Sequence, residues 1–150
     1  MRIYLDVSCL NRPFDDQTQA RIRLESEAVT LIFERIDSGS WTRVSSEMAE
    51  REIAAMSDAE RRKRVRALLP KPMSELTESI WARAAELQAL GLKPADAVHV
   101  SAAEEARADV FLTCDDRLLG ACRRSAKKLN VIVANPLEWL KELDDAEDAE

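Results

Sequence analysis

Residues 94–116 read PADAVHVSAAEEARADVFLTCDD, and this stretch decides the fold class. Pro94 suits the first position of a helix, because proline lacks an amide hydrogen and the first turn of a helix leaves that group unpaired. The helix is predicted to end near Arg107, and residues 110–113 then have the composition of a buried strand. Asp115 follows that strand directly. A helix that leads into a buried strand is the repeating unit of parallel α/β sheets.

The rest of the chain alternates in the same way between short apolar runs and amphipathic helical patterns. Strands are predicted at residues 3–5, 41–44, 110–113 and 131–133. Helices are predicted at residues 18–37, 46–56, 57–69, 75–90, 94–107, 118–122 and 136–143, and a polar loop is predicted after Asp6. Gly39 and Gly91 are placed to end two of the helices. This order of elements predicts an α/β fold with a mainly parallel sheet.

Composition favours a single water-exposed domain. The chain has 150 residues, of which 46% are hydrophobic and 33% charged, and no stretch approaches the roughly 18 apolar residues of a membrane span. The N-terminus turns polar too soon for a secretory signal, and the three cysteines show no C-x-x-C spacing. We therefore expect one domain over residues 1–140, an acidic tail over residues 141–150, no membrane association and a reducing cytoplasmic location.

The distribution of charge matters more than the formal net charge of −6. Residues 141–150 carry −5 of it, and we expect them to form a frayed, solvated end. Two basic clusters lie in the remainder: Arg61, Arg62, Lys63, Arg64 and Arg66, then Arg123, Arg124, Lys127 and Lys128. Each cluster is either an ordinary solvated helix face or a surface that binds the backbone of a nucleic acid, and we give the two interpretations similar weight. Arg61, Arg62 and Arg64 are the candidates for RNA contact.

Four acids are placed to converge at one edge of the predicted sheet. Asp6 and Asp115 follow strands at their carboxyl ends, where parallel sheets form ligand sites. Glu52 flanks the apolar stripe of its helix, and Asp96 lies in the first turn of another. Each has an ordinary structural alternative: a helix cap for Asp115, an ion pair for Glu52 and compensation of the helix dipole for Asp96. Asp6 has a weaker one, because its loop is not expected to start a helix at once.

Carboxylates that converge repel one another unless a hard cation neutralises them, and ligand sets made only of oxygen select Mg²⁺ or Mn²⁺ over zinc. His99, the only histidine, lies one turn after Asp96 and is expected to be a packed, hydrogen-bonded core residue, with catalysis the less favoured alternative. Trp41, Trp81 and Trp139 are also expected to be core or packing residues. A glycine-rich phosphate loop is lacking, as is a Ser/His/Asp order suited to nucleophilic catalysis.

The pattern of these motifs resembles the PIN-domain family, and within it the toxin-type nucleases that are paired with antitoxins. The matching stretches are Ile3-Tyr4-Leu5-Asp6 with Ser8, Val44-Ser45-Ser46 with Glu52-Ile53, Pro94-Ala95-Asp96-Ala97-Val98-His99, Phe111-Leu112-Thr113-Cys114-Asp115, and Asn135-Pro136-Leu137. The resemblance implies a three-layer α/β/α sandwich. It also implies metal-dependent cleavage of RNA by Asp6, Glu52, Asp96 and Asp115, supported by Ser8 and Thr113, in which the cation strengthens a water nucleophile and stabilises the leaving oxygen. Asp116 could share the metal-binding role of Asp115 or replace it, and Glu47 or Glu50 could stand in for Glu52.

Two rival functions remain at this point. One is a catalytically silent domain that binds RNA or protein, and the complete set of four acids counts against it. The other is a phosphoacceptor receiver domain with Asp6 as the modified residue; it wants an acidic neighbour of Asp6 and a lysine directly after Val133, and the chain has neither. The apolar stripe of the helix at residues 75–90 also suggests a homodimer, as is common in the family, with internal packing nearly as well favoured. A cognate antitoxin protein is a further expected partner.

Overall fold

A computed structural model describes residues 1–149 of the chain. Its centre is a four-stranded parallel sheet in the order β2-β1-β3-β4. The strands are β1 (Arg2–Leu5), β2 (Thr42–Val44), β3 (Val110–Leu112) and β4 (Ile132–Ala134). All four predicted strands are therefore present, and because they are all parallel their carboxyl ends lie along one edge of the sheet.

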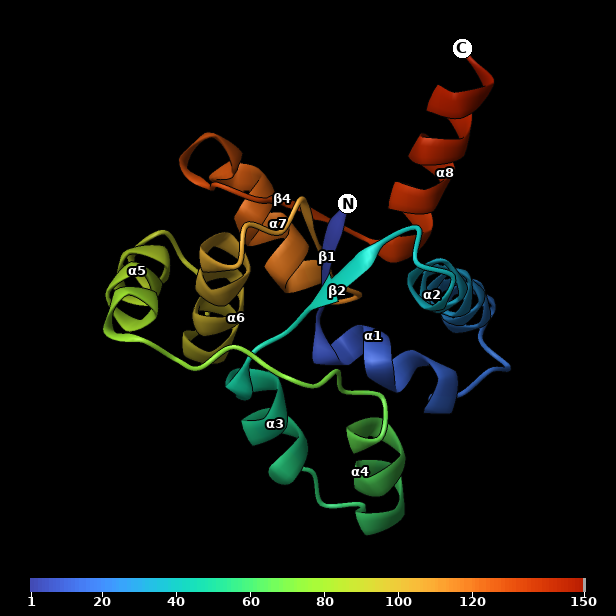
Figure 1. Ribbon diagram of the computed structural model, residues 1–150, viewed down its shortest axis with the longest axis horizontal. Coiled ribbons are helices and arrows are strands. Elements are labelled where there is room, and N and C mark those ends of the chain that lie inside the picture. The colour runs from blue at the N-terminus through green and yellow to red at the C-terminus, as the bar shows by residue number, and fades with distance from the viewer. Residues whose placement is uncertain (150) are drawn as a thin grey trace.

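Helices cover both faces of this sheet. They are α1 (Val7–Asn11), α2 (Ala20–Asp37), α3 (Glu47–Ala54), α4 (Ala59–Arg66), α5 (Glu78–Ala89), α6 (Pro94–Glu105), α7 (Asp116–Arg124) and α8 (Pro136–Asp148), with 3-10 turns η1 (Arg12–Phe14) and η2 (Ala126–Lys128). In Figure 1 α5, α6 and α7 lie on one side of the strands, and α2 and α8 lie on the other. The three-layer α/β/α arrangement is thus confirmed.

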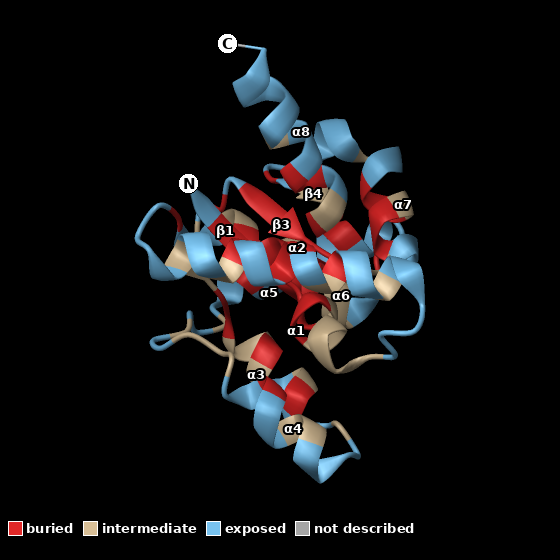
Figure 2. Ribbon diagram, turned by 90° about the vertical axis from the view of Figure 1, so that its right-hand side faces the viewer, coloured by how far each residue is buried: buried red, intermediate tan, exposed pale blue. Residues whose placement is uncertain are grey.

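Alternation along the strands builds a separate core on each face. Ile3 and Leu5 of β1 pack with α1, α2 and α8, whereas Tyr4 between them packs with Phe111 against α5, α6 and α7. Successive side chains of a strand point to opposite faces, so one short strand serves both layers. Figure 2 shows β1 and β3 largely buried behind helices whose outer faces are exposed. Each fully buried large apolar side chain contributes roughly 1.5–3 kcal/mol.

Several predicted helix boundaries hold because of their caps. Gly39 and Gly91 follow α2 and α5 with φ of 85° and 107°, a region that L side chains rarely enter, which confirms both helix ends. α5 begins at Glu78 and not at residue 75, because the hydroxyl of Thr77 accepts a hydrogen bond from the amide of Ile80 and fixes the cap there.

Two predictions about chain ends and loops are wrong. The stretch after Asp6 is not a polar loop, because α1 starts at Val7 and buries Cys9 and Leu10. The acidic C-terminal segment is solvated but not frayed, since α8 continues to Asp148 and extends away from the rest of the molecule (Figure 1). The amide of Ala149 still bonds the carbonyl of Asp145 at 3.1 Å, so the helical hydrogen-bond pattern outlasts the apolar contacts that anchor its start.

The tryptophans divide into two kinds. Trp41 and Trp139 are buried and pack against each other with ring centres 5.1 Å apart, as expected. Trp81 on α5 is 44% exposed, so of the two expected roles it is a packing residue and not a core one; the guanidinium of Arg51 lies 5.8 Å from its ring centre. Trp81 lies on the apolar stripe of α5 that suggested a homodimer. The other apolar side chains of this stripe pack inside the molecule, since α5 packs along α6 and buries Ile80, Ala84 and Leu87. Internal packing therefore accounts for most of the stripe, and a homodimer through its remainder stays untested.

Within residues 1–149, no helix combines the length and the apolar character that crossing a bilayer requires.

Candidate metal centre

Asp6 occupies the junction between β1 and α1. Its amide donates a 2.9 Å hydrogen bond to the carbonyl of Leu112 on the neighbouring strand β3. Its Oδ1 accepts a hydrogen bond from the amide of Val7, also at 2.9 Å, so Asp6 is the N-cap of α1. The carboxylate therefore stands at the carboxyl edge of the two central strands and has a structural role besides any chemical one.

Two hydroxyl groups hold the other oxygen of Asp6. Ser8 Oγ and Thr113 Oγ1 donate to Oδ2 at 2.8 and 2.7 Å, and the two hydroxyls lie 3.2 Å apart. Asp6 is only 5% exposed, and burial raises the pKa of its carboxyl although His99 and Thr113 act to lower it. The structure thus brings Ser8 and Thr113, the two residues expected to support the site, into contact with Asp6.

Glu52 reaches the same region from α3. Its Oε1 lies 3.1 Å from Nε2 of His99, whereas Glu50 turns away and pairs with Arg66 at 3.0 Å. This helical register favours Glu52 as the acid of α3, as predicted, over Glu50. The amide of Glu47 pairs with the carbonyl of Ser74, so Glu47 belongs to the first turn of α3, where its segment bridges to Ser74.

Asp96 lies in the first turn of α6 and is partly buried. Burial, followed by the negative charges of Asp6, Asp115 and Glu52 in that order, raises the pKa of its carboxyl to about 6. Asp96 therefore lies within the electrostatic influence of the other three predicted acids. The helix dipole favours the charged form of Asp96, whereas burial and these like charges together disfavour it.

Asp115 and Asp116 open α7 in different ways. Asp115 Oδ1 accepts hydrogen bonds from the amides of Arg117 and Leu118, which makes Asp115 the N-cap of α7, and its own amide donates to Thr113 Oγ1 at 3.1 Å. Asp116 is exposed, and both of its oxygens accept 2.7 Å hydrogen bonds from the guanidinium of Arg21. Asp115 is thus tied to the Asp6 network through Thr113, whereas Asp116 is engaged with α2.

His99 is part of this centre to a degree that sequence reasoning missed. It is fully buried and hydrogen-bonded, as expected, with Nδ1 2.7 Å from the hydroxyl of Tyr4. However, its ring also lies among the acids. One potential metal-ligand atom from each of Asp6, Glu52 and His99 lies within 4.8 Å of the other two. The position of His99 one turn after Asp96 was a usable signal, but only the fold shows that its Nε2 lies 3.1 Å from Oε1 of Glu52.

The basic residues predicted to contact RNA are largely engaged in internal contacts. Arg61 pairs with Asp15 at 2.7 Å and also donates to the carbonyl of Phe14, and Arg62 donates to the carbonyl of Met56 at 2.7 Å. Arg64 is exposed and pairs with Glu60 of its own helix at 3.2 Å. These contacts hold α4 against η1 and against the segment that follows α3. The guanidinium groups of Arg61 and Arg62 therefore stabilise the fold, whether or not they also bind RNA.

A different set of basic side chains borders the acids. A cavity of about 320 Å³ between α6 and α7 is lined by Asp96 and Asp116 together with Lys93, Arg117 and Arg124. Of these, only Arg124 belonged to a basic cluster noted in the sequence. Lys93 and Arg117 are isolated in the chain, and the packing of α7 beside the start of α6 is what brings them to one place.

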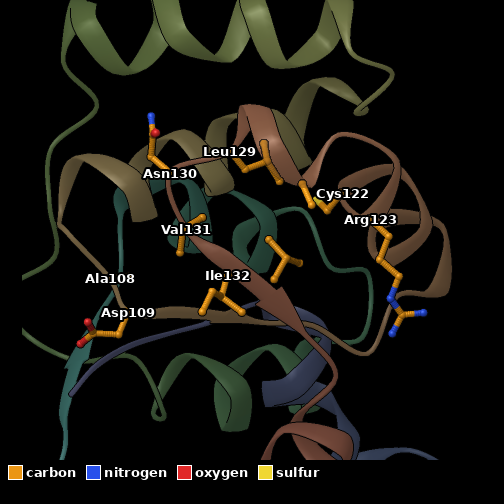
Figure 3. Close-up of a pocket in the computed structure, with 10 residues that line it drawn as sticks. Ala108, Asp109, Cys122, Arg123, Leu129, Asn130, Val131 and Ile132 are labelled. Carbon is orange, nitrogen blue, oxygen red and sulfur yellow. The ribbon is translucent and has the colours of Figure 1, made fainter.

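A larger cavity, of about 570 Å³, lies away from this chemistry. Figure 3 shows its lining, which includes Ala108, Asp109, Val131 and Ile132. These residues precede or begin β3 and β4, whereas Asp6 and Asp115 follow the ends of their strands. The cavity thus lies at the opposite end of the parallel sheet from the acids, and volume alone does not mark the site.

The donor set fits a divalent cation. Asp6 and Asp96 are both carboxylates whose pKa burial and like charge raise, which is the arrangement that a cation relieves. In addition, Nε2 of His99 is buried without a well-aligned hydrogen-bond partner. Asp6 and Glu52 could hold such an ion through oxygen, with His99 as the adjacent nitrogen donor. Asp96 and Asp115 lie outside the group of ligand atoms within 4.8 Å of one another, although the charges of Asp6, Asp115 and Glu52 act on Asp96.

Comparison with known proteins agrees with this geometry. Set against curated proteins, the chain shows no match. A family model described as PIN domain matches residues 3–123, which spans the strands β1, β2 and β3 and all four acids. PIN domains are generally metal-dependent nucleases, and the acidic cluster described above is compatible with that chemistry. Because the match extends over most of its length, the chain belongs to the PIN-domain family.

Proposed function

We propose that this protein is a metal-dependent endoribonuclease that uses Mg²⁺ or Mn²⁺ and acts as the toxin of a toxin–antitoxin pair. The observation that carries the nuclease part is the convergence of Asp6 and Glu52 beside His99 at one edge of the sheet, with one ligand atom of each within 4.8 Å of the others. Asp96 is close enough for the charges of Asp6, Asp115 and Glu52 to help raise the pKa of its carboxyl. Such a cluster is unfavourable in the folded chain by itself, as the raised pKa of Asp96, to about 6, indicates. A bound cation would neutralise the repulsion between the carboxylates, and the relief of that repulsion would favour cation binding.

The side chains divide the work of hydrolysis between them. Asp6 is held by the hydroxyls of Ser8 and Thr113 and by the amide of Val7, so the direction of its remaining lone pair is fixed. Glu52 and Asp96 are only partly buried and complete the anionic pocket from the helix side. When a divalent cation is bound there, it supplies the charge that strengthens a water nucleophile and stabilises the leaving oxygen. Cleavage of this kind leaves 5′-phosphate and 3′-hydroxyl ends.

The cavity between α6 and α7 is the proposed path of the RNA strand. Lys93, Arg117 and Arg124 line it beside Asp96. Positive side chains there would neutralise phosphates that flank the scissile bond, and so hold the chain in line with the acids. Its volume of about 320 Å³ is that of a site for a nucleotide and not for a whole duplex.

The biological role is the finer part of the proposal. The resemblance of the motifs to toxin-type nucleases supports a cytoplasmic enzyme that is restrained by a cognate antitoxin protein. In the native operon, a short upstream gene that encodes a DNA-binding domain with a disordered tail would fit this role. Growth arrest on expression of the chain, relieved by co-expression of that neighbour and absent for Asp6→Asn, is the expected result. A chain that is harmless while its purified form cleaves RNA would remove the toxin role alone.

The biochemical test is Mn²⁺-dependent cleavage of a labelled single-stranded RNA by the purified protein. Wild type should cut internally, and each of Asp6→Asn, Glu52→Gln and Asp96→Asn should lose at least about a hundredfold in rate, because each removes a charge from the same centre. RNA binding without cleavage at any metal concentration would instead support a catalytically silent domain.

A further inference from the structure

One nitrogen at the acidic centre has no well-aligned partner. The side chain of His99 is fully buried, and Nε2 has no hydrogen bond of acceptable geometry. Glu52 Oε1 is within 3.1 Å, so the distance is that of an ion pair, but the direction of the ring nitrogen misses that oxygen. We give the direction more weight than the distance, because a ring nitrogen donates or accepts only in the plane of its ring. Nε2 therefore points beside the carboxylate, and a buried polar atom left in this way needs an explanation.

The other side of the ring is held firmly. His99 Nδ1 lies 2.7 Å from the hydroxyl of Tyr4, which in turn lies 2.8 Å from Ser46 Oγ. If Tyr4 donates to Ser46, it accepts from Nδ1–H, and in the neutral imidazole Nε2 then carries a lone pair. A histidine that binds a metal usually donates its other N–H to an oxygen in this way, which fixes both the tautomer and the ring orientation. Tyr4 lies on β1 and Ser46 caps α3, so the ring is anchored to the sheet.

We propose that His99 Nε2 is a metal ligand alongside Asp6 and Glu52, so that the centre has mixed nitrogen and oxygen ligands and prefers first-row transition ions such as Mn²⁺ to Mg²⁺. The inference rests on the proposed function, since it names the metal chemistry of that same site. Imidazole is a ligand for transition ions, whereas Mg²⁺ strongly prefers oxygen. A set of four carboxylates alone would show no such preference for nitrogen-binding ions.

The geometry leaves room for this ligand set. Ligand atoms about 2.1 Å from one ion lie roughly 3–4 Å apart, and the atoms of Asp6, Glu52 and His99 are already within 4.8 Å of one another. Asp6 and His99 are almost fully buried, whereas the side chain of Glu52 is 28% exposed. Glu52 is therefore the side chain that can move to bring its oxygen within bonding distance of the same ion. A carboxylate has about four acceptor positions. Asp6 uses three of them for Val7, Ser8 and Thr113, which leaves one for the ion.

The direct test uses the fact that the chain has a single histidine. The protein is made with an affinity tag that lacks histidine, loaded with Mn²⁺ alone and examined by pulsed electron paramagnetic resonance. A directly bound ¹⁴N should modulate the signal, and growth with ¹⁵N-histidine should replace that pattern by the one of ¹⁵N. One Mn²⁺ bound per chain with no nitrogen coupling would overturn the His99 inference but keep the metal site. No Mn²⁺ binding at all would overturn both the inference and the metal site of the proposed function.

Selectivity gives an independent measurement. His99→Gln keeps a polar side chain of similar length, and it should lower the affinity for Mn²⁺ about tenfold or more while the affinity for Mg²⁺ falls by much less. Asp96→Asn is the matched control, because the loss of an oxygen ligand should weaken both ions by a similar factor. Equal losses of Mn²⁺ and Mg²⁺ affinity in His99→Gln would mean that His99 only supports the fold, and would overturn the inference. If His99→Gln does not fold, the spectroscopic measurement on the wild-type protein decides alone.

Discussion

Thr113 Oγ1 donates a 2.7 Å hydrogen bond to Asp6 Oδ2, although the two residues are separated by 107 positions in the chain. The bond joins the ends of β1 and β3, which are neighbours in the sheet. Thr113 in turn accepts a hydrogen bond from the amide of Asp115 at 3.1 Å. One hydroxyl group therefore links two of the four acids, and the direction of the Asp6 carboxylate depends on it.

Replacing Thr113 with Val removes this donor but keeps the shape of the side chain. Because Thr113 lowers the pKa of Asp6, its loss should raise that pKa further above its already raised position. The carboxylate would then form only at higher pH, so the acid limb of the pH–rate profile should move upward. Metal affinity should fall about 10–100-fold, as for other residues that orient a ligand. The same exchange at the exposed Thr42 is the control, and an acid limb that stays in place in Thr113→Val would contradict the role assigned to this hydroxyl.

Asp96→Asn should stabilise the metal-free protein at pH 7. Burial and the neighbouring acids raise the pKa of Asp96 from 3.8 to about 6, so its ionised form is disfavoured in the folded chain. After allowance for solvent screening, its removal should add about 1 kcal/mol, or roughly 2–4 °C in Tm. Thermal melts in excess chelator measure this, with Asp144→Asn on the exposed face of α8 as the control. A less stable Asp96→Asn that still cleaves RNA would sink the shared acidic centre.

The same carboxyl predicts a pH dependence. A carboxyl whose pKa is higher in the folded than in the unfolded protein does not lower stability at a pH where it is protonated in both states. Its destabilising effect grows as the pH rises from the pKa of the unfolded state to the pKa of the folded state. The Tm advantage of Asp96→Asn should therefore be absent below about pH 4 and should develop between pH 3.8 and about 6. Melting curves of both proteins over that range give the difference directly. An advantage that is the same at pH 3.5 and at pH 7 would point to a cause other than ionisation.

RNA affinity should depend on the basic side chains of the cavity between α6 and α7. Removing the charges of Arg117 and Arg124 should flatten the plot of log affinity against log salt by about 1.4, because each phosphate contact on a single strand contributes about 0.7. Catalytically inactive Asp6→Asn protein allows binding to be measured without cleavage.

The comparison is the triple replacement of Arg61, Arg62 and Arg64 with Ala, which tests the interpretation based on sequence. Two of these guanidinium groups already bind Asp15 and backbone carbonyls, so we expect a loss of stability and the smaller change in slope. A larger change in slope for the triple variant would place the RNA along α4 instead.

The buried carboxylate of Glu25 leads to a prediction about the stability of the fold and not about activity. It is 1% exposed on α2 and binds Arg12 at 3.0 Å, Arg21 at 3.5 Å and the side-chain amide of Asn135, which caps α8. Glu25→Gln removes the charge that these donors share and should cost about 2–4 kcal/mol. Chemical denaturation measures it, with the exposed Glu27→Gln of the same helix as the control. A change below about 0.5 kcal/mol would mean that the cluster is not holding α2 to α8.

The strands and most helices could be predicted because each is a local pattern. The apolar run before Asp115, Pro94 at the start of α6 and the glycines after α2 and α5 are all signals within a few residues. Asp6 and Asp115 could be placed at the same edge because parallel strands share a direction. The start of α1 escaped prediction because its cap is Asp6 itself, a residue whose position already suggested chemistry.

The features of the fold and of the site that could not be predicted depend on contacts between segments far apart in the sequence. Nothing near Tyr4 in the sequence indicates that its hydroxyl meets His99, 95 positions away. Likewise, Arg61 belongs to a basic run whose use is decided by Asp15, which lies 46 positions earlier. Periodicity placed Trp81 on an apolar stripe, but α6 covers only the part of that stripe that Ile80, Ala84 and Leu87 form. Patterns report which face of a helix is apolar, and only packing decides how much of it is covered.

The central claim is that the acids at the end of β1, on α3 and at the starts of α6 and α7 form one metal-dependent site that cuts RNA. The most direct measurement titrates Mn²⁺ into wild type and Asp96→Asn, and follows metal binding and cleavage of a labelled RNA in the same samples. The account predicts that wild-type cleavage rises with metal occupancy and that Asp96→Asn loses affinity and cleavage together. Wild-type cleavage that is unaffected by chelator, or full activity in Asp96→Asn, would contradict it.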